Sequence, residues 1–429
     1  MSAPQSDLIT PVVASTRVRR SRLHRSLRLA AADLFRSPRG AVPGITRATL
    51  GRLVLLWAVA RAVSLGLLWG AYQIASAMKL THGPDGNRIG TFLDYLTEWD
   101  ADRYGQISQD GYPISLPMNV QGDILPNNWA FLPVFPTLER FVAPVFGGSW
   151  QFAGVTLSIL ASLGATIVLF VLLRRTTTPT AAWWAVVFFS FAPLSFVFVL
   201  GYAESLLMLL VFTALLLAQQ RRYWLIAPIG VIAAFTRPGA LAIALALGIL
   251  FLVRFFRRRV DPFPLSQAGG IIVSGILSAT AGLLWPIIAQ AVTGTRDAYI
   301  RTETGWWLKS VGNDDFIPLT PWFRQAGTHL GIIGIILVIA LMVGFGMLLW
   351  SRSVRRLGIV IVAFAFSYGL YLFAVFLPQQ STFRLMVPLS PLLGDQRLSS
   401  TPRRRGAILV GCIALQALCV WALWTVNHP

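Results

Sequence analysis

The chain has 429 residues, of which 55% are hydrophobic and only 12% are charged. This composition, with a mean hydropathy of +0.65, excludes an ordinary soluble domain. The net charge of +19 would suggest nucleic acid as the partner of a soluble protein. Here the Lys and Arg residues gather at one set of segment ends, as in cytoplasmic loops, so we expect no nucleic-acid partner.

Residues 1–48 are polar and rich in arginine, as in RVRRSRLHRSLR. They contain no apolar segment followed by a small-residue cleavage site, so a cleaved signal peptide is not expected. We expect a disordered cytoplasmic arm that contacts anionic membrane lipids and places the start of the next segment on the inner side.

Apolar blocks of about twenty residues follow, and they predict an all-α polytopic membrane protein with about eleven transmembrane helices. The expected spans are 51–78, 151–173, 180–200, 203–220, two short helices within 223–254, 269–292, 329–350, 357–377, 383–396 and 406–425. The two short helices meet at Thr236-Arg237-Pro238-Gly239, because Pro and Gly interrupt a helix. Loops 79–150 and 293–328 are then external, and thirteen of the seventeen acidic residues lie outside.

The segment after the first span is the most acidic part of the chain. With its close neighbours, it holds eight of the seventeen acidic residues. Four of its apolar residues share the i, i+3, i+4, i+7 spacing of one helix face: Phe92, Tyr95, Leu96 and Trp99. This spacing predicts an amphipathic external helix that lies along the membrane surface.

Asp100 and Asp102 are the first candidates for chemistry, because they fall on opposite shoulders of that apolar face. A carboxylate at a dry boundary can have a raised pKa and act as a general base toward a hydroxyl. Two alternatives stay open: a solvated acidic face, and the D-x-D metal clamp of nucleotide-sugar transferases. The four histidines are scattered without the spacing of metal ligands. We therefore expect no cofactor. Only the D-x-D alternative would involve a bound divalent metal ion.

Arg237 and Arg384 lie at breaks near the predicted outer ends of spans. An arginine binds phosphate with a two-pronged fork and stays charged when partly desolvated, so both are candidates for holding an anion. The alternative is that each extends toward a lipid headgroup. Glu204 begins a span at the same level, either as a counter-ion for an arginine or as a carboxylate favoured by the helix dipole.

Aromatic side chains concentrate on the external loops. The tryptophans there are Trp99, Trp129, Trp306, Trp307 and Trp322. They indicate an interfacial belt or, alternatively, aromatic platforms for a sugar ring. No P-loop, G-x-S-x-G or H-E-x-x-H motif occurs, so ATP-driven and serine-hydrolase chemistry lack support.

Several motifs occur in a fixed order over roughly residues 50–395. They are Trp99-Asp100-x-x-x-Tyr104, Gly111-Tyr112-Pro113, Ala130-Phe131-x-Pro133, Tyr202-x-Glu204-Ser205, Thr236-Arg237-Pro238-Gly239 and Phe383-Arg384. Together they resemble the PIG-V family, the glycosylphosphatidylinositol second-mannose transferases and their bacterial relatives. That family belongs to the GT-C class of membrane glycosyltransferases. Its eukaryotic acceptor implies that a bacterial relative mannosylates something else.

The resemblance implies a GT-C-like transmembrane catalytic domain over 49–396. It also implies an inverting transfer of mannose from polyprenyl-phosphate mannose. Outside the resemblance, the charge and hydropathy of 397–429 predict a cytoplasmic loop and a last transmembrane helix. The strong preference for Arg over Lys suggests a bacterial source, so we expect a bacterial plasma membrane, with the active site facing outside.

The resemblance also distributes roles among the candidate residues. Asp100 would be the catalytic base, with Asp102 and Glu204 as secondary acidic residues. Arg237 or Arg384 would hold the donor phosphate. Substrate contacts are expected from four aromatic residues: Trp99, Tyr104, Tyr112 and Trp129.

The physical argument agrees with this chemistry, because a lipid-phosphate donor carries its sugar at the membrane interface. A nucleotide-diphosphate donor would need a cytoplasmic site, whereas the acidic loop is predicted outside. The sequence thus predicts a mannosyltransferase with a lipid or cell-envelope glycan acceptor. A flippase or transporter for a lipid-linked or anionic solute stays open, with Arg237 and Arg384 as its clamp, although no inverted repeat is visible. A non-catalytic scaffold is the third possibility.

Overall fold

The computed structural model describes residues 32–35, 45–82, 87–88, 90–306, 317–376 and 378–426. Six helices in this part of the chain are long and apolar enough to cross a membrane: Arg47–Ala77 (α2), Trp150–Arg174 (α6), Pro238–Phe256 (η5 and α10), Leu265–Thr293 (α11), Pro321–Trp350 (α14) and Pro402–Val426 (α18 and η7). Four shorter apolar helices join them: Pro179–Ser190 (α7), Glu204–Gln219 (α8), Tyr223–Ala234 (η4 and α9) and Ile359–Val375 (α16). The predicted all-α membrane architecture is confirmed.

The predicted span 383–396 has a different form from the others. It consists of one helical turn, Thr382–Leu385 (α17), and a 3-10 helix, Val387–Gly394 (η6). Pro388 and Pro391 lack a backbone N–H, so this segment cannot form a regular α-helix.

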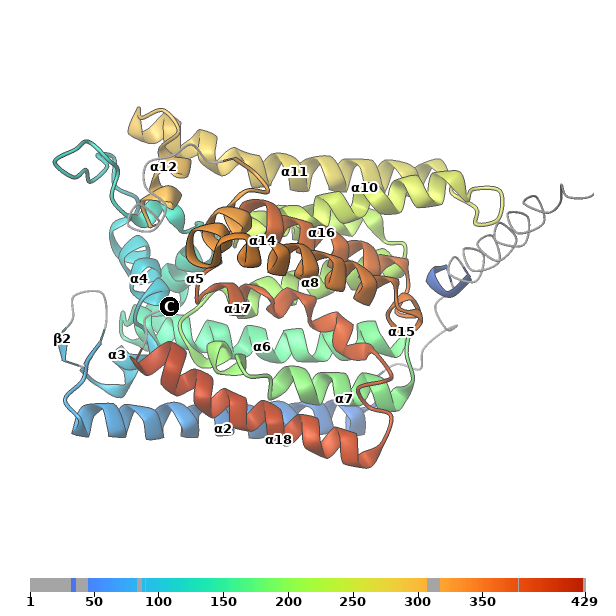
Figure 1. Cartoon of the computed structure of the whole chain (residues 1–429), viewed down its shortest axis with the longest axis horizontal. Coiled ribbons are helices and arrows are strands. Elements are labelled where there is room, and N and C mark those ends of the chain that lie inside the picture. The colour runs from blue at the N-terminus through green and yellow to red at the C-terminus, as the bar shows by residue number, and fades with distance from the viewer. Residues whose placement is uncertain are drawn as a thin grey trace, which may run out of the picture.

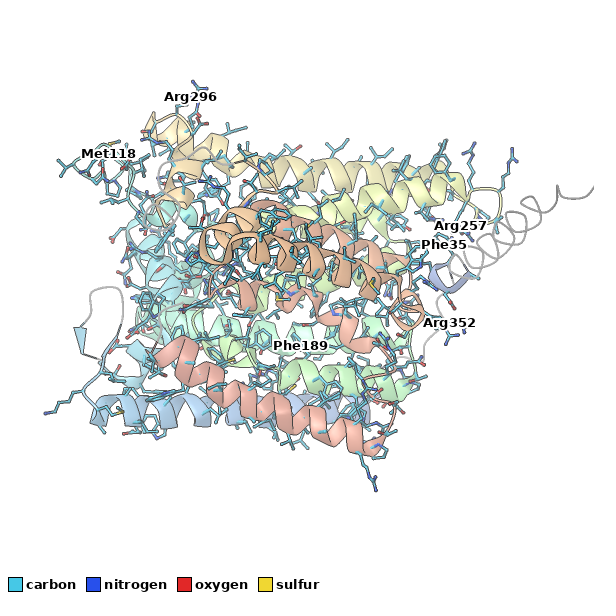
Figure 2. The ribbon with its side chains drawn as sticks, in the orientation of Figure 1. Phe35, Met118, Phe189, Arg257, Arg296 and Arg352 are labelled. Carbon is cyan, nitrogen blue, oxygen red and sulfur yellow. The ribbon has the colours of Figure 1, made fainter. Side chains whose placement is uncertain are left out.

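The long helices run side by side, and the short elements gather at their two ends (Figure 1). One end, here called the acidic end, carries Phe92–Leu96 (α3), Asp100–Asp110 (α4), Val134–Val142 (α5) and Ala298–Gly305 (α12). The other, here called the basic end, carries Arg352–Arg355 (α15). Figure 2 shows Met118 and Arg296 at the acidic end, and Phe35, Arg257 and Arg352 at the basic end.

Further short elements lie in the segments around α3, α4 and α5. They are a two-stranded antiparallel pair, Thr81–His82 (β1) with Asn87–Arg88 (β2), and the 3-10 helices Asn128–Ala130 (η1) and Ala143–Phe146 (η2).

The prediction of one continuous amphipathic helix through residue 102 is wrong. α3 starts with a capping box between Thr91 and Asp94 and stops at Leu96, and a turn at Thr97–Trp99 separates it from α4. The buried face of α3 packs on protein, since the Tyr95 hydroxyl lies 2.7 Å from Thr425 Oγ1 at the end of the last helix. α3 is therefore part of the fold and is held by α2 and the C-terminal helix.

The predicted span 180–200 is interrupted as well. α7 ends at Ser190, and a 3-10 helix, Ser195–Val199 (η3), completes the segment. The buried Arg61 of α2 donates hydrogen bonds of 2.7 Å to the carbonyl oxygens of Ser190 and Ser195. The bond to Ser190 satisfies a carbonyl at the open end of α7, and the bond to Ser195 ties α2 to the start of η3. These two contacts explain an arginine inside an apolar helix.

The predicted break between the two short helices of 223–254 is confirmed. α9 ends at Ala234, Arg237 has extended backbone angles, and η5 starts at Pro238. The side chain of Arg237 therefore projects from the break between the two helices.

Most of the predicted arm 1–48 lies outside the described residues. Within the described part, the Asp33 carboxylate forms ion pairs at 3.2–3.8 Å with three arginines of the basic end: Arg352, Arg355 and Arg356.

Candidate active site

α4 presents its first residue, Asp100, through an unusual turn. Trp99, the N-cap, has φ 59° and ψ −114°, a backbone conformation that residues other than glycine rarely adopt. Asp100 and Asp102 both lie in the first turn of α4, where the helix dipole favours negative charge. The strained Trp99 backbone thus sets the direction in which the Asp100 carboxylate leaves the helix.

Two arginines meet the Asp100 carboxylate. Arg384 Nη2 lies 2.7 Å from Asp100 Oδ2, and Arg384 Nε lies 3.6 Å from Glu204 Oε1. Arg237 Nη1 lies 2.8 Å from Glu204 Oε1 and 3.6 Å from Asp100 Oδ2. We call Asp100, Glu204, Arg237 and Arg384 the charged quartet.

The quartet is largely shielded from solvent, since its side chains are between 3% and 15% exposed. Two carboxylates and two guanidinium groups balance in charge, which reduces the cost of burying each of them. The alternative that both arginines extend to lipid headgroups is therefore wrong for this structure. Glu204 is a counter-ion of both arginines.

Arg384 keeps capacity for a further ligand. Its guanidinium lies over the Tyr202 ring, 5.1 Å from the centroid, which holds the side chain in place. Its Nη1 atom is buried and has no hydrogen-bond acceptor among the described residues. An anion that entered here would find a pre-oriented donor.

A cavity of about 420 Å³ opens beside the quartet. Its lining includes Asp100, Arg237 and Arg384, but not Glu204. Polar and aromatic side chains from other elements complete it: Tyr104, Glu303, Trp306, Tyr368, Tyr371, Gln379 and Gln380. A volume of this size accommodates a small polar ligand of about the size of a sugar phosphate.

Asp102 is separated from this cavity. It accepts a hydrogen bond of 2.8 Å from Gln106 Nε2, one turn further along α4, and it does not line the cavity. Asp100 and Asp102 therefore face different surroundings. Within the described residues, no three His, Cys, Asp or Glu side chains are close enough to hold a metal ion together.

The structure distributes the four predicted substrate-contact aromatics unequally. Tyr104 lines the cavity, whereas Trp99 is not part of its lining. Tyr112 and Trp129 form a cluster with Trp285, with ring centroids 4.7–5.1 Å apart. Hydrogen bonds fix this cluster, including one of 3.0 Å from Trp285 Nε1 to the Trp129 carbonyl. The geometry gives Tyr112 and Trp129 a packing role, and their contact with a substrate stays a prediction.

Sequence reasoning did not single out Glu303, Tyr368 or Tyr371. Burial raises the pKa of the Glu303 carboxyl to about 7, against the lowering effects of a hydrogen bond with Tyr299 and of the nearby Arg237. The signal available in the sequence was weak: two tyrosines three residues apart in an apolar span, and one acidic residue among aromatics in the predicted external loop 293–328. Trp307, expected in an interfacial belt or, alternatively, as a platform for a sugar ring, lies outside the described residues.

A second, apolar cavity of about 710 Å³ begins next to the quartet. Its lining starts at Phe383, the neighbour of Arg384, and continues along η6 to Leu398 near the basic end. The end of α14 contributes Leu348, and η7, which follows α18, contributes Leu423. An extended apolar chain could therefore lie beside the polar cavity.

No family model and no curated protein sequence matches the chain. Among solved structures, it is similar to ArnT from Cupriavidus metallidurans bound to undecaprenyl phosphate, with 16% identity, a TM-score of 0.45, and coverage of 86% of this chain and 64% of ArnT. It is also similar to the Archaeoglobus fulgidus oligosaccharyltransferase in complex with zinc and sulfate, with 14% identity, a TM-score of 0.42, and coverage of 87% and 52%. A third match is AglB of the same archaeon with an inhibitory peptide and a dolichol-phosphate, with 12% identity, a TM-score of 0.40, and coverage of 89% and 56%. The chain thus spans only about half to two thirds of the length of these proteins.

Proposed function

We propose that this protein transfers mannose from polyprenyl-phosphate mannose to a lipid or cell-envelope glycan acceptor on the outer face of the membrane, with inversion. The observation that carries the proposal is the charged quartet, in which one carboxylate and two arginines share the edge of a polar cavity. The resemblance to the PIG-V family, drawn from the motifs around these residues, supports the choice of mannose as the sugar.

In this mechanism the donor phosphate competes with the carboxylates for the arginines. Arg237 and Arg384 bind the phosphate oxygens, and the Asp100 carboxylate is released toward the cavity. The acceptor hydroxyl then attacks the anomeric carbon while Asp100 accepts its proton. The bond between the anomeric carbon and the phosphate oxygen breaks, and the departing polyprenyl phosphate takes the bonding electron pair. Its phosphate thereby gains a second negative charge, which both guanidinium groups stabilise. No step requires a metal.

The apolar cavity supports a lipid-linked donor. Phe383 lines this cavity, and the next residue, Arg384, belongs to the quartet. A prenyl chain in the apolar cavity would thus leave its phosphate within reach of Arg384. A water-soluble nucleotide sugar has no apolar chain that could bind to this surface.

The proposal is tested with purified protein in nanodiscs that contain polyprenyl-phosphate mannose and an extract of bacterial envelope lipids. Arg384→Gln keeps much of the size of the side chain but removes the charge, so donor binding should weaken about tenfold or more. Arg324→Gln, in the first turns of α14, is the control for loss of an arginine outside the cavity lining.

Transfer of mannose from a nucleotide sugar alone would refute the donor assignment. Movement of the lipid across the bilayer without a glycosyl product would favour the flippase or transporter. Since the mechanism uses no metal, chelation with EDTA should leave the transfer rate unchanged.

A further inference from the structure

One carboxylate in the polar cavity has no part in the chemistry described above. Glu303, near the end of α12, lines the same cavity as Asp100 and Arg237. It belongs to the second external segment, whereas the quartet comes from the first external segment and three breaks between helices. Its position thus depends on how α12 docks.

α12 is anchored firmly to the first external segment. The buried Thr302 Oγ1 accepts a hydrogen bond of 2.9 Å from Asn127 Nδ2. Ala298, with no exposed surface, packs in the cluster of Trp129 and Trp285. At Gly305 an added Cβ would lie 2.7 Å from the Ile124 carbonyl oxygen, so the backbones are in direct contact there. The Glu303 side chain is therefore presented from a fixed backbone.

Glu303 is a hydrogen-bond acceptor, and the residues around it supply aromatic surface. Tyr299, one turn earlier on α12, forms a hydrogen bond with the Glu303 carboxylate. Trp306 lines the cavity with a side chain that is 44% exposed, and Tyr371 lines it from α16. We call Glu303, Trp306 and Tyr371 the α12 wall.

This chemistry matches a sugar ring. A carboxylate accepts hydrogen bonds from neighbouring hydroxyls, and an indole ring packs against the apolar C–H face of a pyranose. A second phosphate is disfavoured at the α12 wall, because an ionised Glu303 would repel it. A cationic ligand is disfavoured by Arg237, whose charge acts on Glu303.

We propose that the α12 wall is the acceptor subsite, and that it takes a glycosyl or polyol headgroup whose hydroxyls donate to Glu303. This inference rests on the proposed function and adds the class of the acceptor. A hydroxyl bound there shares the cavity with Asp100, the proposed base. Glu303 positions the acceptor, while Asp100 removes the proton.

A pH dependence of acceptor binding follows. The groups that act on the Glu303 carboxyl are Tyr299 on the same helix, Arg237 at the break before α10, and Asp100 on α4, and Glu303 in turn acts on Tyr371 of α16. The ionised form has more acceptor capacity than the protonated form. Because its pKa is about 7, the affinity for the acceptor should rise with pH through about 7 and then level off.

The test uses the full chain in nanodiscs with octyl α-mannoside as the acceptor, and n-octanol as a probe with the same tail and a single hydroxyl. Glu303→Gln should raise the KM for octyl α-mannoside about tenfold or more, flatten its pH dependence, and leave donor affinity unchanged. Glu303→Asp should recover part of the affinity. Asp297→Asn, at an exposed carboxylate just before α12, is the matched control and should behave like the wild type.

Binding of octyl α-mannoside is also measured without donor, by saturation-transfer difference NMR. Sugar binding that depends on Glu303, in a protein that transfers no mannose, would support the acceptor subsite but refute the proposed function. An unchanged KM and pH profile in Glu303→Gln would refute the subsite while the function stands. Transfer to a serine-containing peptide and not to octyl α-mannoside would also overturn the subsite.

Discussion

At the scale of single residues, the quartet separates two carboxylates that are close neighbours in the sequence. Asp100 faces Arg237 and Arg384 at the cavity, whereas Asp102 is hydrogen-bonded to Gln106 along α4. Residues two positions apart on an α-helix point in directions that differ by about 200°. If one of the two carboxylates faces the cavity, the other therefore faces away from it.

Asp100→Asn should abolish most of the transfer, because an amide cannot accept the acceptor's proton. Loss of a general base typically costs about 10²- to 10⁴-fold in rate. Donor binding should persist, since both arginines stay in place. The measurement is single-turnover mannose transfer together with a donor-binding assay at equal protein concentration.

The matched control is Asp102→Asn, which changes the same chemical group away from the cavity and should cost much less. If the two effects were reversed, Asp102 would become the base. Large losses in both variants that added manganese restores would point to a metal clamp.

At the scale of elements, the direction of Asp100 depends on how α4 packs on α6. Gly105 lies in α4 opposite Trp150, the first residue of α6, and a Cβ at Gly105 would come within 2.5 Å of the indole ring. The absence of a side chain is thus required for the observed approach of the two helices. The breaks before α4, α8 and α10 and at α17 serve the same site, because each one turns a charged side chain into the quartet.

Gly105→Ala should therefore move α4 and reduce transfer, although Asp100 itself is unchanged. A displacement of about 1 Å at a reacting group can cost on the order of 10²-fold in rate. Gly66→Ala in α2 is the control, since no heavy atom lies within 4 Å of its added Cβ. Activity is compared per amount of folded protein, judged by size-exclusion chromatography.

A second substitution, Trp150→Leu, would make room for the new methyl group and should restore part of the activity of Gly105→Ala. Equal activity in the Gly105→Ala and Gly66→Ala variants would show that the position of α4 does not matter.

At the scale of the whole molecule, the two ends differ in what they can contact. The acidic end contains the polar cavity, and the basic end carries the arginines that bind Asp33. The rule that basic loops face the cytoplasm predicts that the cavity opens on the outer side.

Cysteine labelling checks this orientation in bacterial cells that express the protein. Val120 is fully exposed at the acidic end, and Val260 is 79% exposed at the basic end. In a background without Cys412 and Cys419, Val120→Cys should react with a membrane-impermeant maleimide in intact cells. Val260→Cys should react only after permeabilisation.

The opposite labelling pattern would place the cavity on the cytoplasmic side. The proposed donor, which carries its sugar at the outer interface, would then no longer fit the site.

The sequence by itself determined the features that depend on local composition and spacing. Apolar blocks predicted the membrane helices, because each block is long enough to cross a bilayer. Pro238 and Gly239 predicted the break at Arg237, since the backbone of these residues interrupts a helix. The motif around Trp99 and Asp100 indicated Asp100 as the candidate base before any distance was known.

Only the tertiary structure decided which of these side chains meet. Asp100, Arg237 and Arg384 lie far apart in the sequence, and their contact depends on packing between α4, α8 and two breaks. The same packing brought Glu303 into the cavity and placed Trp129 in a buried cluster. Hydrophobic spacing is periodic along one segment and therefore shows which face of that segment is buried. Which element packs against that face depends on the shapes and charges of distant segments.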